Sequence, residues 1–173
     1  MTTRNAIASQ YHASLDMLEQ AITTCPDDLW DDRSHANVFW HVAYHALHYT
    51  HLYLQRSLQD FVPWPGRRGE HESLGRRQQP SDEGNDDGEP YTREEVLAYL
   101  AFCRREVEEQ LGSMEFDAPS GFHWLPFTKL ELQFYNIRHI QHHVGELYER
   151  LAATGGAEVG WAAMHPAESE ERR

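Results

Sequence analysis

Cysteine is scarce in this chain. Only Cys25 and Cys103 occur among 173 residues, far apart and in no CxxC pattern. This usage indicates neither a disulfide framework nor a thiolate zinc site, and it favours two reduced structural thiols over a catalytic one. The sequence also has no apolar run approaching the roughly 20 residues that span a bilayer, and its N-terminus lacks the apolar core of a signal peptide. We therefore expect a cytoplasmic protein without a membrane segment.

Basic residues are few as well. The chain has 15 of them against 28 acidic residues, which gives a formal charge of −13. A protein this acidic repels phosphate backbones, so nucleic-acid binding is disfavoured. We interpret the paired arginines, Arg67-Arg68 and Arg76-Arg77, as solvated loop charge. Apolar residues make up 40% of the chain, and its length fits one domain with a core of its own.

Four segments carry the apolar periodicity of helices, and none shows a convincing strand alternation. Thr92 with Glu95, and Thr128 with Glu131, form two capping-box patterns that predict helix starts. The sequence CPDDLWDD ends the first helix, and TGG ends the last. We predict an all-α four-helix bundle, with helices at about Thr3–Thr24, Ser34–Leu58, Thr92–Leu111 and Thr128–Ala153.

The connections between these helices differ in character. Nine of the thirty residues 61–90 are Gly or Pro, so we expect residues 67–90 to form a mobile and dispensable insertion, with only FVPWP able to dock. Residues 112–127 should instead pack over one end of the bundle through aromatic side chains: Phe116, Phe122, Trp124 and Phe127. The bundle domain is then residues 1–155. We expect residues 156–173 to form a flexible tail, with Trp161 as its candidate anchor.

Histidine is abundant in two of the predicted helices. At about 100° per residue, His45 falls inside the apolar arc of the second helix, among residues such as Val38 and Leu52. The neighbouring His41, His48 and His51 fall in a polar sector and are predicted to face solvent. The apolar surface of this helix is wider than one bundle core covers, and Trp40 and Leu47 lie opposite His45. This pattern predicts a homodimer.

His139 and His143 lie one turn apart at the border of the core in the fourth helix, whereas His142 points away. The i, i+4 spacing lets one helix face offer two imidazoles to a single ion, and His45 is the inward candidate for a third ligand. A lone buried histidine is more often a hydrogen-bonded core residue, and HxxxH also arises by chance. The pattern alone leaves both interpretations open.

Three stretches, FWHVAYHALHYTHLYL, WPG…YTREEVLAYLAFCR and ELQFYNIRHIQHHVGEL, resemble the DinB/YfiT-like superfamily of metalloenzymes. The resemblance extends from the first helix to about Leu151, and NIRHIQHH is its most specific part. It implies a four-helix bundle with a long connection between the second and third helices, often assembled as a homodimer. It also implies a divalent metal, nickel, zinc or iron, held by His45, His139 and His143. The 67–90 loop is longer and more acidic than the family pattern, and His48 and His51 leave room for a second, adventitious ion.

Characterised relatives include S-transferases and isomerases that use low-molecular-weight thiols. The resemblance therefore implies a metal-dependent transferase or hydrolase of small molecules, with open coordination positions for water or substrate. No general base can be named, and Glu146 is interpreted as a surface charge in preference to a group that orients a ligand. The alternative is a non-enzymatic, stress-related dimeric binding protein whose metal is structural or vestigial.

Overall fold

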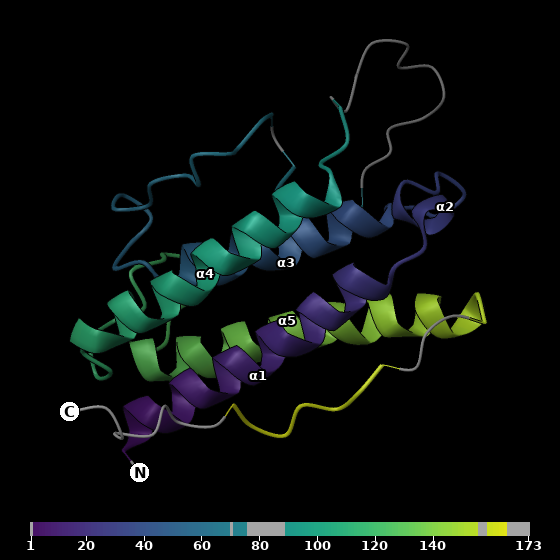
Figure 1. The fold of residues 1–173 in the computed structure, drawn as a ribbon. Helices are drawn as coiled ribbons and strands as arrows, with labels where there is room; N and C mark the ends of the chain where they lie inside the picture. The colour runs from purple at the N-terminus through teal and green to yellow at the C-terminus, as the bar shows by residue number, and fades with distance from the viewer. Residues whose placement is uncertain (1, 70, 76–88, 156–158, 166–173) are drawn as a thin grey trace, which may run out of the picture.

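The computed structural model describes residues 2–69, 71–75, 89–155 and 159–165, and within them the fold is all-helical, without a strand. Four long helices form the bundle in Figure 1, and a single-turn helix, α2, precedes the second of them. In chain order the elements are α1 (Thr3–Thr24), α2 (Asp27–Trp30), α3 (Phe39–Leu54), α4 (Arg93–Ser113) and α5 (Lys129–Ala153). None of the helices in the described part of the chain is long and apolar enough to cross a membrane.

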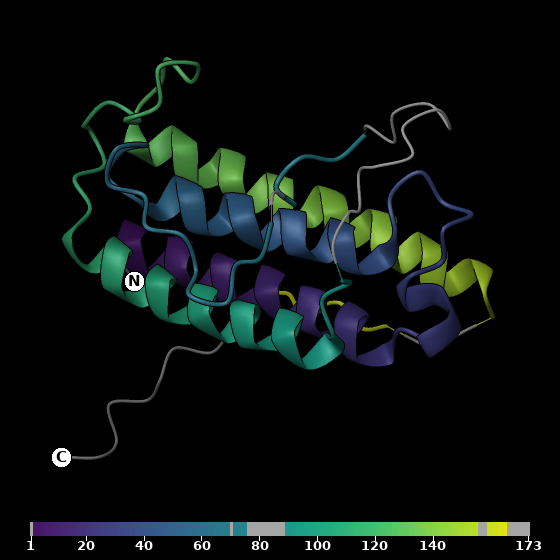
Figure 2. The same ribbon diagram turned by 90° about the horizontal axis from the view of Figure 1, so that it is seen from above.

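The four long helices are arranged so that α1 and α3 lie on opposite corners, as do α4 and α5. Each helix packs against the two at adjacent corners (Figure 2). Helices α3 and α5 are antiparallel, because Lys129 at the start of α5 donates to the carbonyl of Gln55 at the end of α3. Helices α1 and α5 are parallel, because Tyr11 bonds to Gln133 while Tyr148 bonds to the carbonyl of Met17.

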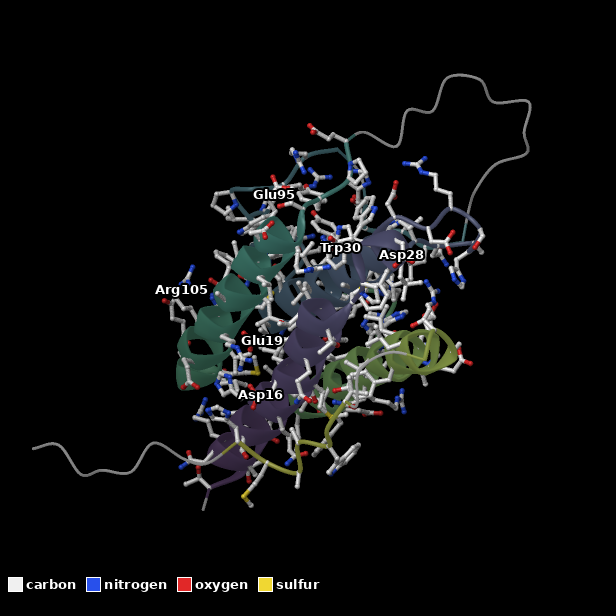
Figure 3. All side chains as sticks on the ribbon, turned by 45° about the vertical axis from the view of Figure 1, so that its right-hand side comes forward. Asp16, Glu19, Asp28, Trp30, Glu95 and Arg105 are labelled. Carbon is white, nitrogen blue, oxygen red and sulfur yellow. The ribbon has the colours of Figure 1, made fainter. Side chains whose placement is uncertain are left out.

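Salt bridges join α1 to the antiparallel α4. Asp16 and Glu19 lie one turn apart on α1 (Figure 3), and each carboxylate lies 2.7 Å from Nη2 of Arg104. At the α1–α2 junction, Arg93 donates to the carbonyl of Cys25 at 2.6 Å. Helix α4 therefore runs in the direction of α3, and two parallel neighbours must be joined by a connection that returns along the bundle. This connection spans residues 55–92.

Helix boundaries follow local capping. The Thr92–Glu95 capping box is present in full, and the Thr128 side chain accepts from the backbone N–H of Glu131. The second predicted helix is shorter than expected at both ends. Val38 has extended backbone angles and α3 begins only at Phe39, while Gln55, also extended, ends the helix. Periodicity could not show these ends because the flanking segments carry apolar residues too.

The core lies between the four helices and is filled by large side chains such as Tyr11, Phe39 and Leu47, none of them more than 1% exposed. Trp40 is also buried, at 2% exposure. Trp40 and Leu47 are therefore covered within one chain, and the dimer argument built on their exposure is wrong. Phe134 on α5 points away from this core and is 59% exposed.

After α3 the chain folds back over this helix. We call residues 55–69 and 71–75 the strap. The strap covers one side of α3. The Phe61 ring lies 4.8 Å from that of His51, and His71 is buried. The backbone N–H of Gly75 donates to the side chain of Asn37 at 3.0 Å. We expected no packed side chains in the 67–90 insertion, and this expectation is wrong for residues 71–75. Residues 76–88 lie outside the described part.

Two further segments close the bundle. In the 112–127 loop Phe122 is buried, as expected, and packs with Leu52 and Leu132, while Trp124 stays 42% exposed. Residues 159–165 run along α1, where the carbonyl of His165 accepts from Ser9 and the N–H of Gly160 donates to Gln20. These contacts use the main chain of the segment. Trp161 is 78% exposed and is not the anchor expected in the tail, of which residues 156–158 and 166–173 lie outside the described part.

Candidate metal centre

Three imidazoles converge between α3 and α5. Nε2 of His139 lies 3.2 Å from Nε2 of His45 and 3.2 Å from Nε2 of His143. One nitrogen from each ring lies within 4.8 Å of the other two. The antiparallel packing explains the meeting, since the middle of α3 then faces the middle of α5. The three histidines selected from helix geometry are thus brought together, and they form a group that can hold a metal ion.

The strap contacts His45 at Nδ1, the ring nitrogen that does not face the other two histidines. Its Nδ1 lies 2.6 Å from the backbone carbonyl of Glu72. A carbonyl oxygen only accepts, so the proton of the neutral ring is on Nδ1 and the lone pair is on Nε2. That lone pair faces the other two histidines. The main chain of the strap therefore fixes the tautomer that metal ligation requires.

His143 has an outer partner on its own helix. Its Nδ1 lies 3.3 Å from Oε2 of Glu146, and the other carboxylate oxygen pairs with Arg150. The hydrogen bond from His143, assisted by the charge of Arg150, holds the pKa of Glu146 below its usual value. The carboxylate is thus an acceptor, which again places the imidazole proton on Nδ1 and the lone pair on Nε2. Glu146 is part of the centre and was wrongly interpreted as a surface charge.

The donor set fits a cation. With the Nε2 atoms of His45 and His143 both unprotonated, an N–H on His139 Nε2 could satisfy one of the two lone pairs and not the other. A divalent ion satisfies all three nitrogens. Metal–nitrogen bonds of about 2.05 Å at tetrahedral angles place ligand nitrogens roughly 3.3 Å apart, close to the observed 3.2 Å spacings. Nδ1 of His139 is buried without a hydrogen-bond partner within the described residues.

Burial keeps two of the ligands unprotonated. Desolvation lowers the pKa of His45 to about 4 and that of His139 to about 3, and the neighbouring imidazoles add to the effect. Competition from protons at these two rings therefore begins well below the reference value near 6.5. Neutral imidazole at physiological pH is the form that binds a metal.

The other histidines of α3 and α5 are divided between buried and exposed positions. His142 is exposed and His41 is partly buried, with its Nε2 2.9 Å from the carbonyl of His71. His48 and His51 are buried, at 7% and 2% exposure, so the expectation that they face solvent is wrong. The strap covers that face of α3, and a helix considered alone gives no sign of it. These rings pack against Phe61 and do not join the three-histidine group.

Sequence reasoning considered Glu146 as a group that orients a ligand but preferred a surface charge, and it missed Glu72. The spacing of Glu146, three residues after His143, was a usable signal, because such residues are neighbours on a helix. Glu72 acts through its main chain, and the sequence carries no signal for that contact.

Residues 10–147 match the DinB superfamily. Because this match covers well over half of the chain, the protein belongs to the DinB superfamily. No curated protein and no solved structure matches the sequence. The family and the three-histidine cluster together agree with the resemblance seen in the sequence.

Proposed function

We propose that this DinB-superfamily protein is a metal-dependent enzyme that acts on small molecules. His45, His139 and His143 would hold one divalent ion, nickel, zinc or iron. The observation that carries the proposal is the convergence of three imidazoles, in which Nε2 of His139 lies 3.2 Å from Nε2 of each of the other two. Two of the three have their lone pairs fixed by outer hydrogen bonds. Three neutral ligands leave positions for a further group, as catalytic zinc sites do and closed structural sites do not.

Thiol transfer is the favoured reaction class. An ion of this kind makes a thiol or a water molecule nucleophilic near neutral pH. Metal-assisted hydrolysis also needs a group that moves protons, for which a carboxylate is one candidate. Within the described residues no carboxylate oxygen joins the group of convergent ligand atoms, and Glu146 is engaged on the far side of His143. Both points support a transferase that uses a low-molecular-weight thiol. The cytoplasmic location expected from the sequence suits such a reaction, because cytosolic thiols are kept reduced.

The metal assignment is tested by single substitutions. Tag-free protein purified without chelator or nickel resin should contain about one ion per chain. Replacing His45, His139 or His143 by Ala should abolish stoichiometric binding, because two imidazoles hold a divalent ion poorly. His142→Ala is the matched control on the same helix, and it should keep one ion. Equal losses in the control and in the ligand variants would contradict the assignment.

The reaction class is tested with cobalt as a spectroscopic probe. Small thiols added to the cobalt-loaded protein should produce sulfur-to-metal charge-transfer absorption, and His45→Ala should show none. A spectrum indifferent to thiols but sensitive to pH near 7 would favour hydrolysis instead. A spectrum unmoved by either would contradict the enzyme proposal and favour the non-enzymatic binding protein.

A further inference from the structure

Glu146 lies next to His143, on the side of the ring that faces away from the other two histidines. It lies on α5 almost one turn after His143, and its Oε2 accepts from Nδ1 of that ring at 3.3 Å. Its side chain is 32% exposed, whereas that of His143 is 7% exposed. The contact is thus made at the Nδ1 edge of the imidazole, away from the convergent Nε2 atoms.

Arg150 fixes the carboxylate in this position. Its Nη2 pairs with Oε1 of Glu146, and its side chain is only 10% exposed. Its Nη1 donates to the backbone carbonyl of Asn37 at 2.7 Å. Asn37 lies just before α3, the helix that carries His45. The arginine therefore ties the partner of one ligand to the helix of another.

Asn37 also connects this group of hydrogen bonds to the strap. Its side-chain carbonyl accepts from the N–H of Gly75 at 3.0 Å, three residues after Glu72, whose carbonyl holds His45. The outer hydrogen bonds of both ligands thus belong to one connected network. Such a network restrains ring rotation more strongly than two isolated contacts do.

We propose that Glu146 is a positioning residue of the metal centre that acts through His143. This inference rests on the proposed function, since it assumes that the three histidines bind an ion. The carboxylate holds the proton of His143 on Nδ1 and keeps the Nε2 lone pair aimed at the ion. Arg150 keeps the carboxylate in place and compensates its charge. Loss of such an outer partner weakens metal binding by roughly 10- to 100-fold in known sites.

Glu146→Gln tests the role without changing the size of the side chain. A glutamine can turn either its oxygen or its amide group toward Nδ1, so it no longer enforces one tautomer. The matched control is Glu149→Gln, which removes the same charge from an exposed position on α5. Zinc affinity, measured by competition with a chromophoric chelator, should fall roughly 10- to 100-fold in the first variant and stay unchanged in the second. Nitrogen NMR shifts of metal-free protein should show His143 losing its single Nδ1–H tautomer only in Glu146→Gln.

Arg150→Gln separates positioning from a merely structural role. It breaks the same ion pair but leaves the carboxylate beside His143, so it should bind zinc more tightly than Glu146→Gln. Equal losses in these two variants would overturn the inference, as would wild-type zinc affinity together with an unchanged tautomer in Glu146→Gln. Absence of zinc binding by the wild-type chain would instead overturn the proposed function and the inference with it. If Glu146→Gln does not fold, the nitrogen shifts of His143 in the metal-free wild-type protein decide: a single Nδ1–H tautomer supports the role, and an Nε2–H tautomer refutes it.

Discussion

His51 should make the protein sensitive to acid, although it is not a metal ligand. The strap buries its ring, which lies 4.8 Å from Phe61 and 4.8 Å from Phe102, with Nδ1 3.3 Å from the hydroxyl of Tyr99. Desolvation lowers the pKa of His51 from 6.5 to about 4, and the charge of Glu106 only partly opposes the shift. The folded protein therefore resists a proton that the unfolded chain accepts readily.

The sign and size of the change in stability with pH follow from the difference between the pKa of His51 in the folded protein and in the unfolded chain. The contribution of His51 to the free energy of unfolding is fully present above pH 6.5. It is lost as the pH falls toward 4, because the unfolded state takes up the proton first. At pH 5 the loss is about 2 kcal/mol for a group with these two pKa values, a large part of the roughly 5–15 kcal/mol typical of a domain.

The assay compares wild type with His51→Gln in chelator, by urea unfolding at pH 8 and pH 5. The glutamine does not titrate and can still bond to Tyr99, so the stability difference between the two proteins should shift by about 2 kcal/mol between the two pH values. His123→Gln, at an exposed position, should follow wild type. Parallel curves for wild type and His51→Gln, or an NMR titration of His51 near pH 6.5 in the folded protein, would refute the reasoning.

Four further outcomes are expected. Gly121→Ala should lower the free energy of unfolding by about 1–3 kcal/mol, because Gly121 has a φ of +85° and an added Cβ would lie 2.2 Å from the carbonyl oxygen of Arg56. Gly112→Ala, in α4 with open space around it, should raise it by about 0.5–1 kcal/mol in the same urea measurement. Replacing residues 67–89 with a Gly/Ser linker should lower both the melting temperature and zinc affinity, since it removes the strap contact to His45. Replacing only residues 76–88 should change neither. The homodimer expected from the family resemblance should sediment at twice the 20.2 kDa chain mass, and a 20 kDa species at micromolar concentration would contradict it.

Local rules predicted the helices well where the first turn carries a capping side chain. The first helix has the predicted bounds of Thr3–Thr24, and Thr92 and Thr128 are the caps of α4 and α5. These starts are set by contacts within four residues, which a sequence displays directly. The α3 helix has no side-chain cap at Val38, and its ends were predicted too far out.

The candidate site shows the same division between local and distant causes. His45 was separated from His41 by helix geometry alone, and the structure brings it to His139 and His143. The burial of His48 and His51 depends on a strap of irregular conformation, and periodicity contains no information about such a segment. Burial of Trp40 and Leu47 within the chain has a similar origin, since several elements close around α3.

The diagonal placement of successive helices has a consequence for how the chain folds. Helices α4 and α5 follow one another closely in sequence yet lie on opposite corners, and α1 and α3 do likewise. The bundle therefore lacks the helical hairpins that let most small helical proteins assemble from local contacts. Every adjacent pair must close a loop of more than 35 residues, and this requirement slows folding at a given stability. His45 and His139 are separated by 94 residues, so the three imidazoles meet only when α3 and α5 dock, and no fragment with two consecutive helices would contain the complete centre.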